Sequence, residues 1–150
     1  MRIPYSGRTQ SYPTQDENCA VPKRPAFCAK AIGALQFAWS AAAIDRAADR
    51  HRLVINPVIY AEVSIRYSRI EELDAALPKS MFDREAIPYE AAFLAGKSFL
   101  TYRRRGGTKQ SPLPDFFIGA HAAIAGYQLM TRDAARYRTY FPKLSLIAPS

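Results

Sequence analysis

SPLPDFFIGAHAAIAGYQLMTRDAARY, residues 111–137, frames a helix pattern and a short strand pattern between two acids. Asp115 opens an apolar helical run that extends to about Tyr127, and Asp133 directly follows the strand pattern QLMT. Between these two acids, Arg132 is the one Asp, Glu, Lys or Arg residue. The two carboxylates are therefore either separate helix caps or two parts of one site, and the fold has to decide between them.

Upstream of this stretch, strand and helix patterns alternate in the same way. The β-branched run RLVIN is followed by Pro57, which suits the first turn of a helix, and by the apolar run PVIYAEVSIRY. Further helix patterns cover 41–50, 68–77 and 89–105, and further strand patterns cover 84–87 and 144–148. Ser40 and the capping box Ser68-x-x-Glu71 are expected to begin two of these helices. Strands that are apolar throughout and alternate with helices predict an α/β fold with a parallel sheet flanked by helices.

The N-terminal part of the chain follows no such pattern. Residues 1–37 contain little periodicity and four of the eleven prolines, Pro4, Pro13, Pro22 and Pro25. We expect an irregular arm over 1–37 and one domain over 38–150. The first residues lack the apolar core of a signal peptide, and no apolar run reaches the length of a membrane span, so the expected location is the cytoplasm without membrane attachment. The net charge of +8 favours a polyanionic partner.

The predicted topology brings three acids together. A helix that precedes a parallel strand runs antiparallel to it, so Asp115 at the start of a helix and Asp133 after the next strand belong at the same carboxyl edge. Glu62 joins them because it lies in the second turn of the helix that begins after RLVIN. Open α/β sheets bind ligands at this edge. Three acids that converge there repel one another unless a cation lies between them, and all-oxygen ligands suit Mg²⁺ or Mn²⁺.

Each of these features also has a purely structural interpretation. Asp115 suits a first helical turn, Asp133 suits an N-cap, and Arg66 stands four residues after Glu62, where it could form an ion pair. The segment RRRGGTK, residues 103–109, is either a solvated helix end or a phosphate-binding segment. His121 is expected to be packed and not to act as a base. Four aromatics are spaced like a helix face or a dimer surface: Tyr89, Phe93, Phe99 and Tyr102.

Two parts of the sequence, RLVINPVIYAEVS and the stretch from RRRGGTK to LSLIAP, resemble the PIN-domain ribonucleases, in particular VapC-type toxins of bacterial toxin–antitoxin pairs. The resemblance spans about 38–150 and is most specific in PDFFIGAHA and LMTRDAARY. It implies a PIN-like parallel sheet with an acidic cluster that binds Mg²⁺ or Mn²⁺ for RNA cleavage. Glu62, Asp115 and Asp133 match the second, third and fourth acids of that cluster, and Thr131 and Arg132 match the residues around the fourth.

The same resemblance implies a homodimer and a cognate antitoxin whose C-terminal segment occupies the groove at the site. The family pattern begins with a central strand that ends in an Asp motif such as VDTNV or VDSSV. Residues 1–37 contain no such motif, and their acids are Asp16 and Glu17. We therefore expect a PIN-like domain that lacks the usual first strand and the first catalytic Asp.

The predicted function is a VapC-like, metal-dependent endoribonuclease toxin that is impaired by the absence of this Asp. In it, Glu62, Asp115 and Asp133 hold the metal, and a metal-activated water attacks the RNA phosphodiester. The residues expected to bind the RNA backbone are Arg103, Arg104, Arg105 and Arg132. The alternative is a catalytically inactive PIN-like domain that binds an antitoxin or nucleic acid. A nucleotide-binding doubly wound protein is disfavoured, because the sequence contains no G-x-G-x-x-G or P-loop.

Overall fold

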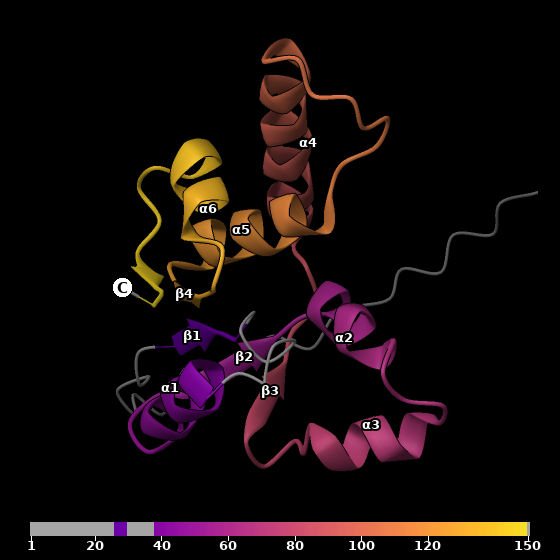
Figure 1. The fold of residues 1–150 in the computed structure, drawn as a ribbon, viewed down its shortest axis with the longest axis vertical. Helices are drawn as coiled ribbons and strands as arrows, with labels where there is room; N and C mark the ends of the chain where they lie inside the picture. Colours follow the sequence, from indigo (N-terminus) through magenta and orange to yellow (C-terminus); the bar gives the residue numbers. More distant parts are fainter. Residues whose placement is uncertain (1–25, 30–37, 150) are drawn as a thin grey trace, which may run out of the picture.

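The computed structural model describes residues 26–29 and 38–149. Within them, five strands form one sheet in the order β3-β2-β1-β4-β5, and every pairing is parallel (Figure 1). The strands are β1 (Ala26–Cys28), β2 (Arg52–Ile55), β3 (Phe82–Arg84), β4 (Gln128–Met130) and β5 (Leu146–Ile147). This arrangement confirms the predicted α/β class and the parallel sheet.

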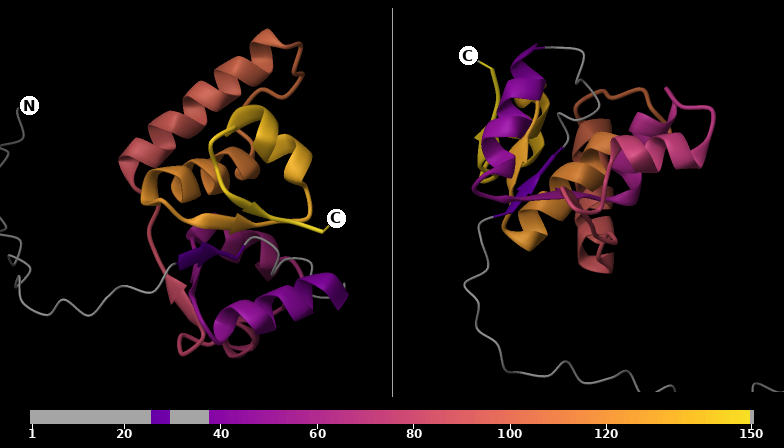
Figure 2. Two further views of the ribbon diagram at one scale, coloured as in Figure 1. Left: turned by 90° about the vertical axis from the view of Figure 1, so that its left-hand side faces the viewer. Right: turned by 90° about the horizontal axis from the view of Figure 1, so that it is seen from below.

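Helices connect the strands and cover both faces of the sheet. They are α1 (Ala38–Ala48), α2 (Pro57–Ser64), α3 (Ile70–Ala76), α4 (Tyr89–Arg104), α5 (Pro114–Ala125) and α6 (Ala134–Tyr140). Figure 2 shows α1 on one face and α4, α5 and α6 on the other. This division follows from right-handed crossovers, because the chain moves across the sheet in one direction from β1 to β3 and in the opposite direction from β3 through β4 to β5.

The helix α5 forms the centre of the second layer. Pro114 occupies its first turn, where a missing N–H costs nothing, and Gly126 ends it in the left-handed conformation at φ 70°. Gly119 allows a close approach to the chain after α6, because a Cβ there would lie 2.5 Å from the Phe141 ring. The buried apolar residues of α5 belong to the hydrophobic core, and they are Phe116, Ile118, Ala120 and Ala122. The sequence therefore predicted this helix well, since nearly every position in it is apolar.

The expectation that the domain lacks a first strand was wrong, because β1 lies at the centre of the sheet. Its backbone pairs with β2 on one side and β4 on the other, and the Ala29 N–H donates to the Val54 carbonyl at 2.9 Å. A strand of three residues directly after Pro25 has no detectable periodicity, so its existence depends on the two partner strands. The remainder of the predicted arm, 1–25 and 30–37, lies outside the described residues.

Several element boundaries also differ from the sequence prediction. Ser40 lies inside α1, and α3 begins at Ile70 after Arg69, which makes no capping hydrogen bond through its side chain. The third strand is Phe82–Arg84, two residues earlier than predicted. Across the described ranges, no helix is long and apolar enough to cross a membrane.

Candidate functional site

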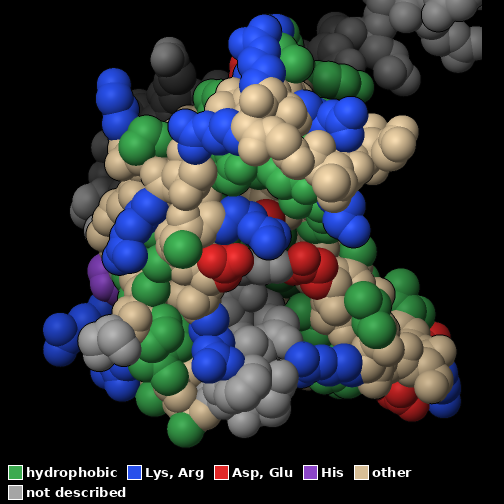
Figure 3. Space-filling view, turned by 45° about the horizontal axis from the view of Figure 1, so that its top comes forward, with side chains coloured by type: hydrophobic (Ala, Val, Ile, Leu, Met, Phe, Trp, Pro, Cys, Tyr) green, Lys and Arg blue, Asp and Glu red, His purple; other side chains and the backbone are tan. Residues whose placement is uncertain are grey.

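The three predicted site acids lie on elements that meet at the carboxyl edge of the sheet. Asp115 is in the first turn of α5, Asp133 lies between β4 and α6, and Glu62 is in the second turn of α2, which begins after β2. On one face of the molecule, Figure 3 shows acidic side chains on both sides of a hollow, with basic side chains between and around them. The geometry places all three acids at the predicted edge.

Arg136 joins two of these acids. Its guanidinium forms an ion pair with the Asp115 carboxylate through Nη1, and its Nε lies 3.6 Å from Asp133 Oδ2. Burial of the guanidinium is the largest single effect, and it lowers the pKa of Arg136. The charge and hydrogen bond of Asp115 and the charge of Asp133 raise this pKa, and together they outweigh burial. The pKa of Arg136 therefore lies above its ordinary value. Asp115 and Asp133 therefore share one positive charge.

Tyr137 holds Asp115 from the same helix as Arg136. The Tyr137 side chain is 1% exposed, and its hydroxyl donates to Asp115 Oδ1 at 3.0 Å. Burial is the largest cause that raises the Tyr137 pKa, followed by the charge and hydrogen bond of Asp115, and the charge of Glu62 has a smaller effect. Glu62 is therefore close enough for its charge to act on the same hydroxyl. Neither Arg136 nor Tyr137 was predicted as a site residue, although both follow Asp133 at helical spacing.

The turn between β4 and α6 fixes the position of Asp133. Buried Thr131 accepts a hydrogen bond from the Asp133 N–H at 3.1 Å through Oγ1. Asp133 Oδ1 in turn accepts from the Arg136 N–H at 3.3 Å, so Asp133 is also the N-cap of α6. The structural and functional interpretations of Asp133 are thus compatible. Asp115 differs, because Leu113 is the N-cap of α5 and the Asp115 carboxylate is directed to α6.

The PIN domain family model matches residues 34–142, which is more than half of the chain. The chain belongs to the PIN domain family. No curated protein matches the sequence significantly.

Solved structures with the same PIN-type fold have little sequence in common with this chain. A chain of VapBC2 from Rickettsia felis, bound to a DNA fragment from its promoter, has a TM-score of 0.61 at 15% identity, covering 82% of this chain and 97% of that one. A chain of VapBC-1 from nontypeable Haemophilus influenzae has a TM-score of 0.63 at 18% identity, with 82% and 96% covered. A chain of FitAcB from Neisseria gonorrhoeae has a TM-score of 0.55 at 12% identity, with 81% and 95% covered.

The central strand of this PIN domain is present, but it ends without the acid that the family pattern has at that position. The strand β1 and the residue after it read Ala-Phe-Cys-Ala, and the family match begins only after this segment. Cys28 is fully buried at the end of β1. Asp16 and Glu17, the acids of the N-terminal segment, lie outside the described residues. The described residues therefore match three of the four acids that the family resemblance implies.

Whether a divalent cation fits this edge depends on the side chains that would bind it. Carboxylates are the ligands that Mg²⁺ and Mn²⁺ prefer. Asp115 and Asp133 both pair with Arg136, so these two carboxylates lie close enough to bind one shared cation. Nevertheless, the described part of the chain contains no group of three His, Cys, Asp or Glu side chains that could hold a metal ion as arranged. The kind of ligand fits, but Arg136 must release the two aspartates before they can bind a metal.

The basic segment after α4 is partly engaged in its own loop. Arg103 donates through Nη1 to the carbonyls of Gly107 and Lys109, at 3.1 and 2.9 Å. The Tyr102 hydroxyl accepts from the Lys109 N–H at 3.4 Å, and the Arg105 guanidinium lies 5.9 Å from the centre of the Tyr140 ring. Arg104 is exposed and makes no such contact with a described residue. Of the three arginines, Arg104 is thus the most available for an outside ligand.

The four aromatics of α4 divide between the surface and the core. Tyr89 is 92% exposed and Phe93 is 67% exposed. Phe99 and Tyr102 instead stack on each other, and Tyr102 also contacts the Phe116 ring edge to face. A surface formed by all four was therefore a wrong expectation, whereas Tyr89 and Phe93 remain on one exposed helix face.

Proposed function

We infer that this PIN domain is a VapC-type endoribonuclease that cleaves RNA slowly because its first acid is missing. The observation that carries this proposal is the pair Asp115 and Asp133 held by Arg136 at the carboxyl edge, with Glu62 acting on the same Tyr137 hydroxyl. Such an arrangement concentrates negative charge where α/β sheets bind ligands. Two separate helix caps would not require it, because the Asp115 carboxylate reaches across to Arg136 and Tyr137 of α6.

The chain's own residues have distinct roles in this proposal. Glu62, Asp115 and Asp133 would hold Mg²⁺ or Mn²⁺, which when bound polarises the phosphate and activates a water. Tyr137 orients the Asp115 carboxylate, and Thr131 orients Asp133 through the turn after β4. RNA would reach this edge in the cytoplasm, with Arg104 and Arg132 as the exposed cations for its backbone.

The partners in this proposal are an antitoxin and a second copy of the chain. Support for an antitoxin comes from the fold neighbours, which belong to structures of VapBC2, VapBC-1 and FitAcB. Support for a homodimer comes from the exposed face of α4, where Tyr89, Phe93 and the 42% exposed Leu100 lie on one side. A Phe93→Asp change is then expected to yield a monomer in light scattering, with the fold unchanged by circular dichroism.

A second function is favoured by the arginine at the site. Because Arg136 already neutralises two acids and β1 supplies none, the domain could bind its antitoxin or nucleic acid without cleaving RNA. This alternative predicts normal partner binding and no metal-dependent cleavage.

Two assays on the intact chain separate the alternatives. Calorimetric titration with Mn²⁺ should show binding that weakens strongly in Asp115→Asn, Asp133→Asn and Glu62→Gln, and remains normal in the surface control Glu90→Gln. RNA incubated with Mn²⁺ should be cleaved slowly by the wild type and not at all by Asp115→Asn. Equal Mn²⁺ affinity in the wild type and all three site variants contradicts the shared site. Binding of Mn²⁺ without any cleavage supports the inactive alternative.

A further inference from the structure

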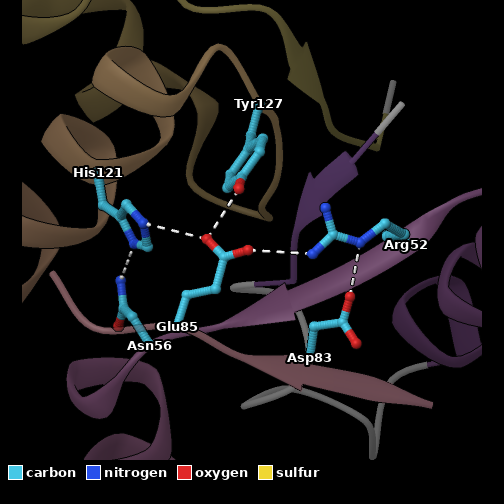
Figure 4. Close-up of polar contacts among 6 residues, drawn as sticks. All are labelled: Arg52, Asn56, Asp83, Glu85, His121 and Tyr127. Atoms are coloured by element: carbon cyan, nitrogen blue, oxygen red, sulfur yellow. Dashed lines mark hydrogen bonds and ion pairs between the residues drawn. The ribbon is translucent and has the colours of Figure 1, made fainter. Parts of the chain in front are cut away.

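A second polar cluster lies between α5 and the β2–β3 half of the sheet, and its centre is His121 (Figure 4). The His121 side chain is 1% exposed in the middle of α5. Its Nδ1 lies 3.1 Å from Asn56 Nδ2, and its Nε2 lies 3.7 Å from Glu85 Oε2. The prediction of a packed histidine is confirmed, but its polar partners were not predicted, because they are 65 and 36 positions away in the sequence.

Asn56 decides which ring nitrogen of His121 carries the proton. Asn56 Oδ1 accepts hydrogen bonds from the N–H groups of Val58 and Ile59, at 3.1 and 3.0 Å. The other end of the amide, Nδ2, therefore faces His121, and an amide nitrogen only donates. His121 Nδ1 must then be the unprotonated acceptor, and the single ring proton lies on Nε2 towards Glu85.

The groups around the ring keep it in this neutral form. Glu85 is held in place by the Tyr127 hydroxyl at 2.8 Å and by Arg52 at 3.1 Å, and Arg52 also pairs with Asp83 at 2.7 Å. Burial lowers the pKa of His121, and the charge of Glu85 opposes this with a smaller effect. A second proton on Nδ1 would also face the Asn56 amide hydrogens. Neutral His121 is thus the form that the contact requires.

The contact connects the two helices that carry site acids. Asn56 begins α2, which carries Glu62 six residues later, and His121 lies six residues after Asp115 on α5. Six helical residues span about 9 Å, so a shift at either end of the contact moves an acid. We propose that the Asn56–His121 hydrogen bond is a positioning contact, in which neutral His121 fixes α2 against α5 and so sets the place of Glu62 relative to Asp115. The effect on metal binding rests on the proposed function, whereas the link between the helices does not.

Asn56→Asp tests the contact without removing the helix cap. Asp and Asn cap helices about equally well, but a carboxylate cannot donate to His121 Nδ1. His121 should therefore take up a proton on Nδ1, and its pKa should rise above the ordinary value of about 6.5. The chain has two histidines, so His51 serves as an internal reference in an NMR pH titration of the imidazole signals. A wild-type spectrum with the proton on Nδ1, or the same His121 titration in both proteins, overturns the proposal.

The coupling between α2 and α5 can be measured without metal, through backbone amide NMR signals. In Asn56→Asp, the backbone amide signals of Glu62 and Asp115 should change with the same midpoint as the His121 ring, well above the range in which carboxylates titrate. A titration of His121 that leaves both amide signals unchanged shows a local contact only and overturns the positioning role.

Metal affinity gives the third readout, in folded variants of His121. His121→Asn keeps an acceptor near the Nδ1 position, whereas His121→Leu removes it. Mn²⁺ affinity should fall by up to about tenfold in His121→Leu, the range of one hydrogen bond, and recover in His121→Asn. Unchanged affinity in a folded Leu variant contradicts the positioning role. Absence of Mn²⁺ binding in the wild type contradicts the proposed function instead, and the amide titration then decides the contact alone.

Discussion

Tyr137→Phe tests whether the carboxyl edge is held together as described. The substitution removes one hydroxyl, which is buried and donates to Asp115 at 3.0 Å, and leaves the ring in its place against Phe141. A hydrogen bond to a charged group typically contributes about 1.5–3 kcal/mol. Asp115 keeps its ion pair with Arg136 and is 17% exposed, so the lower half of this range applies, about 1.5–2 kcal/mol. For a chain of this size, the melting temperature should fall by about 3–8 °C.

The assay is thermal and urea unfolding followed by circular dichroism, with Tyr140→Phe as the matched control. Tyr140 is in the same helix and packs edge to face on Phe116, but its hydroxyl makes no hydrogen bond to a described residue. Its loss should change the free energy of unfolding by no more than about 0.5 kcal/mol. Equal effects of the two substitutions would refute the reasoning, because the Asp115 bond would then contribute nothing specific.

Three further predictions concern the central strand, the basic segment and the helix packing. Cys28→Asp places a carboxylate at the fully buried end of β1, so this variant should be less stable than the wild type. In thermal shift assays, added Mn²⁺ should raise the melting temperature of Cys28→Asp more than that of the control Cys28→Asn. Arg104→Ala should weaken RNA binding and reduce the salt slope by about 0.7, and an unchanged slope would identify Arg104 as part of a solvated helix end. Gly119→Ala should lower stability by about 1–3 kcal/mol in urea unfolding because its Cβ would meet Phe141, whereas Gly96→Ala, with open space around it, should not.

The cluster around His121 also predicts a dependence of stability on pH. Because the folded-state pKa of His121 is depressed, the unfolded chain binds its proton first as the pH falls. The contribution of neutral His121 is therefore complete above about pH 6.5 and decreases as the pH falls below that value. Urea unfolding of the wild type and His121→Asn at a series of pH values should show a smaller decrease in the variant. Parallel curves would mean that His121 is not held neutral.

The sequence by itself determined the elements whose signals are local. Pro57 begins α2 and Asp133 caps α6, because each of these residues acts on backbone groups within a few positions. The parallel topology then placed Asp115 and Asp133 at one edge, since helix and strand directions alternate in an α/β fold. For these parts, sequence patterns and elementary geometry were sufficient.

Tertiary structure decided what depends on partners that are distant in sequence. The strand β1 forms because its backbone makes hydrogen bonds with β2 on one side and β4 on the other. A segment of three residues is too short for a sequence pattern to reveal such a strand. The ion pair of Arg136 with Asp115 and the bond of His121 with Asn56 join residues 21 and 65 positions apart. Such contacts require α5 to pack against α6 and α2 at one particular register, and only the assembled layers of helices and strands fix that register.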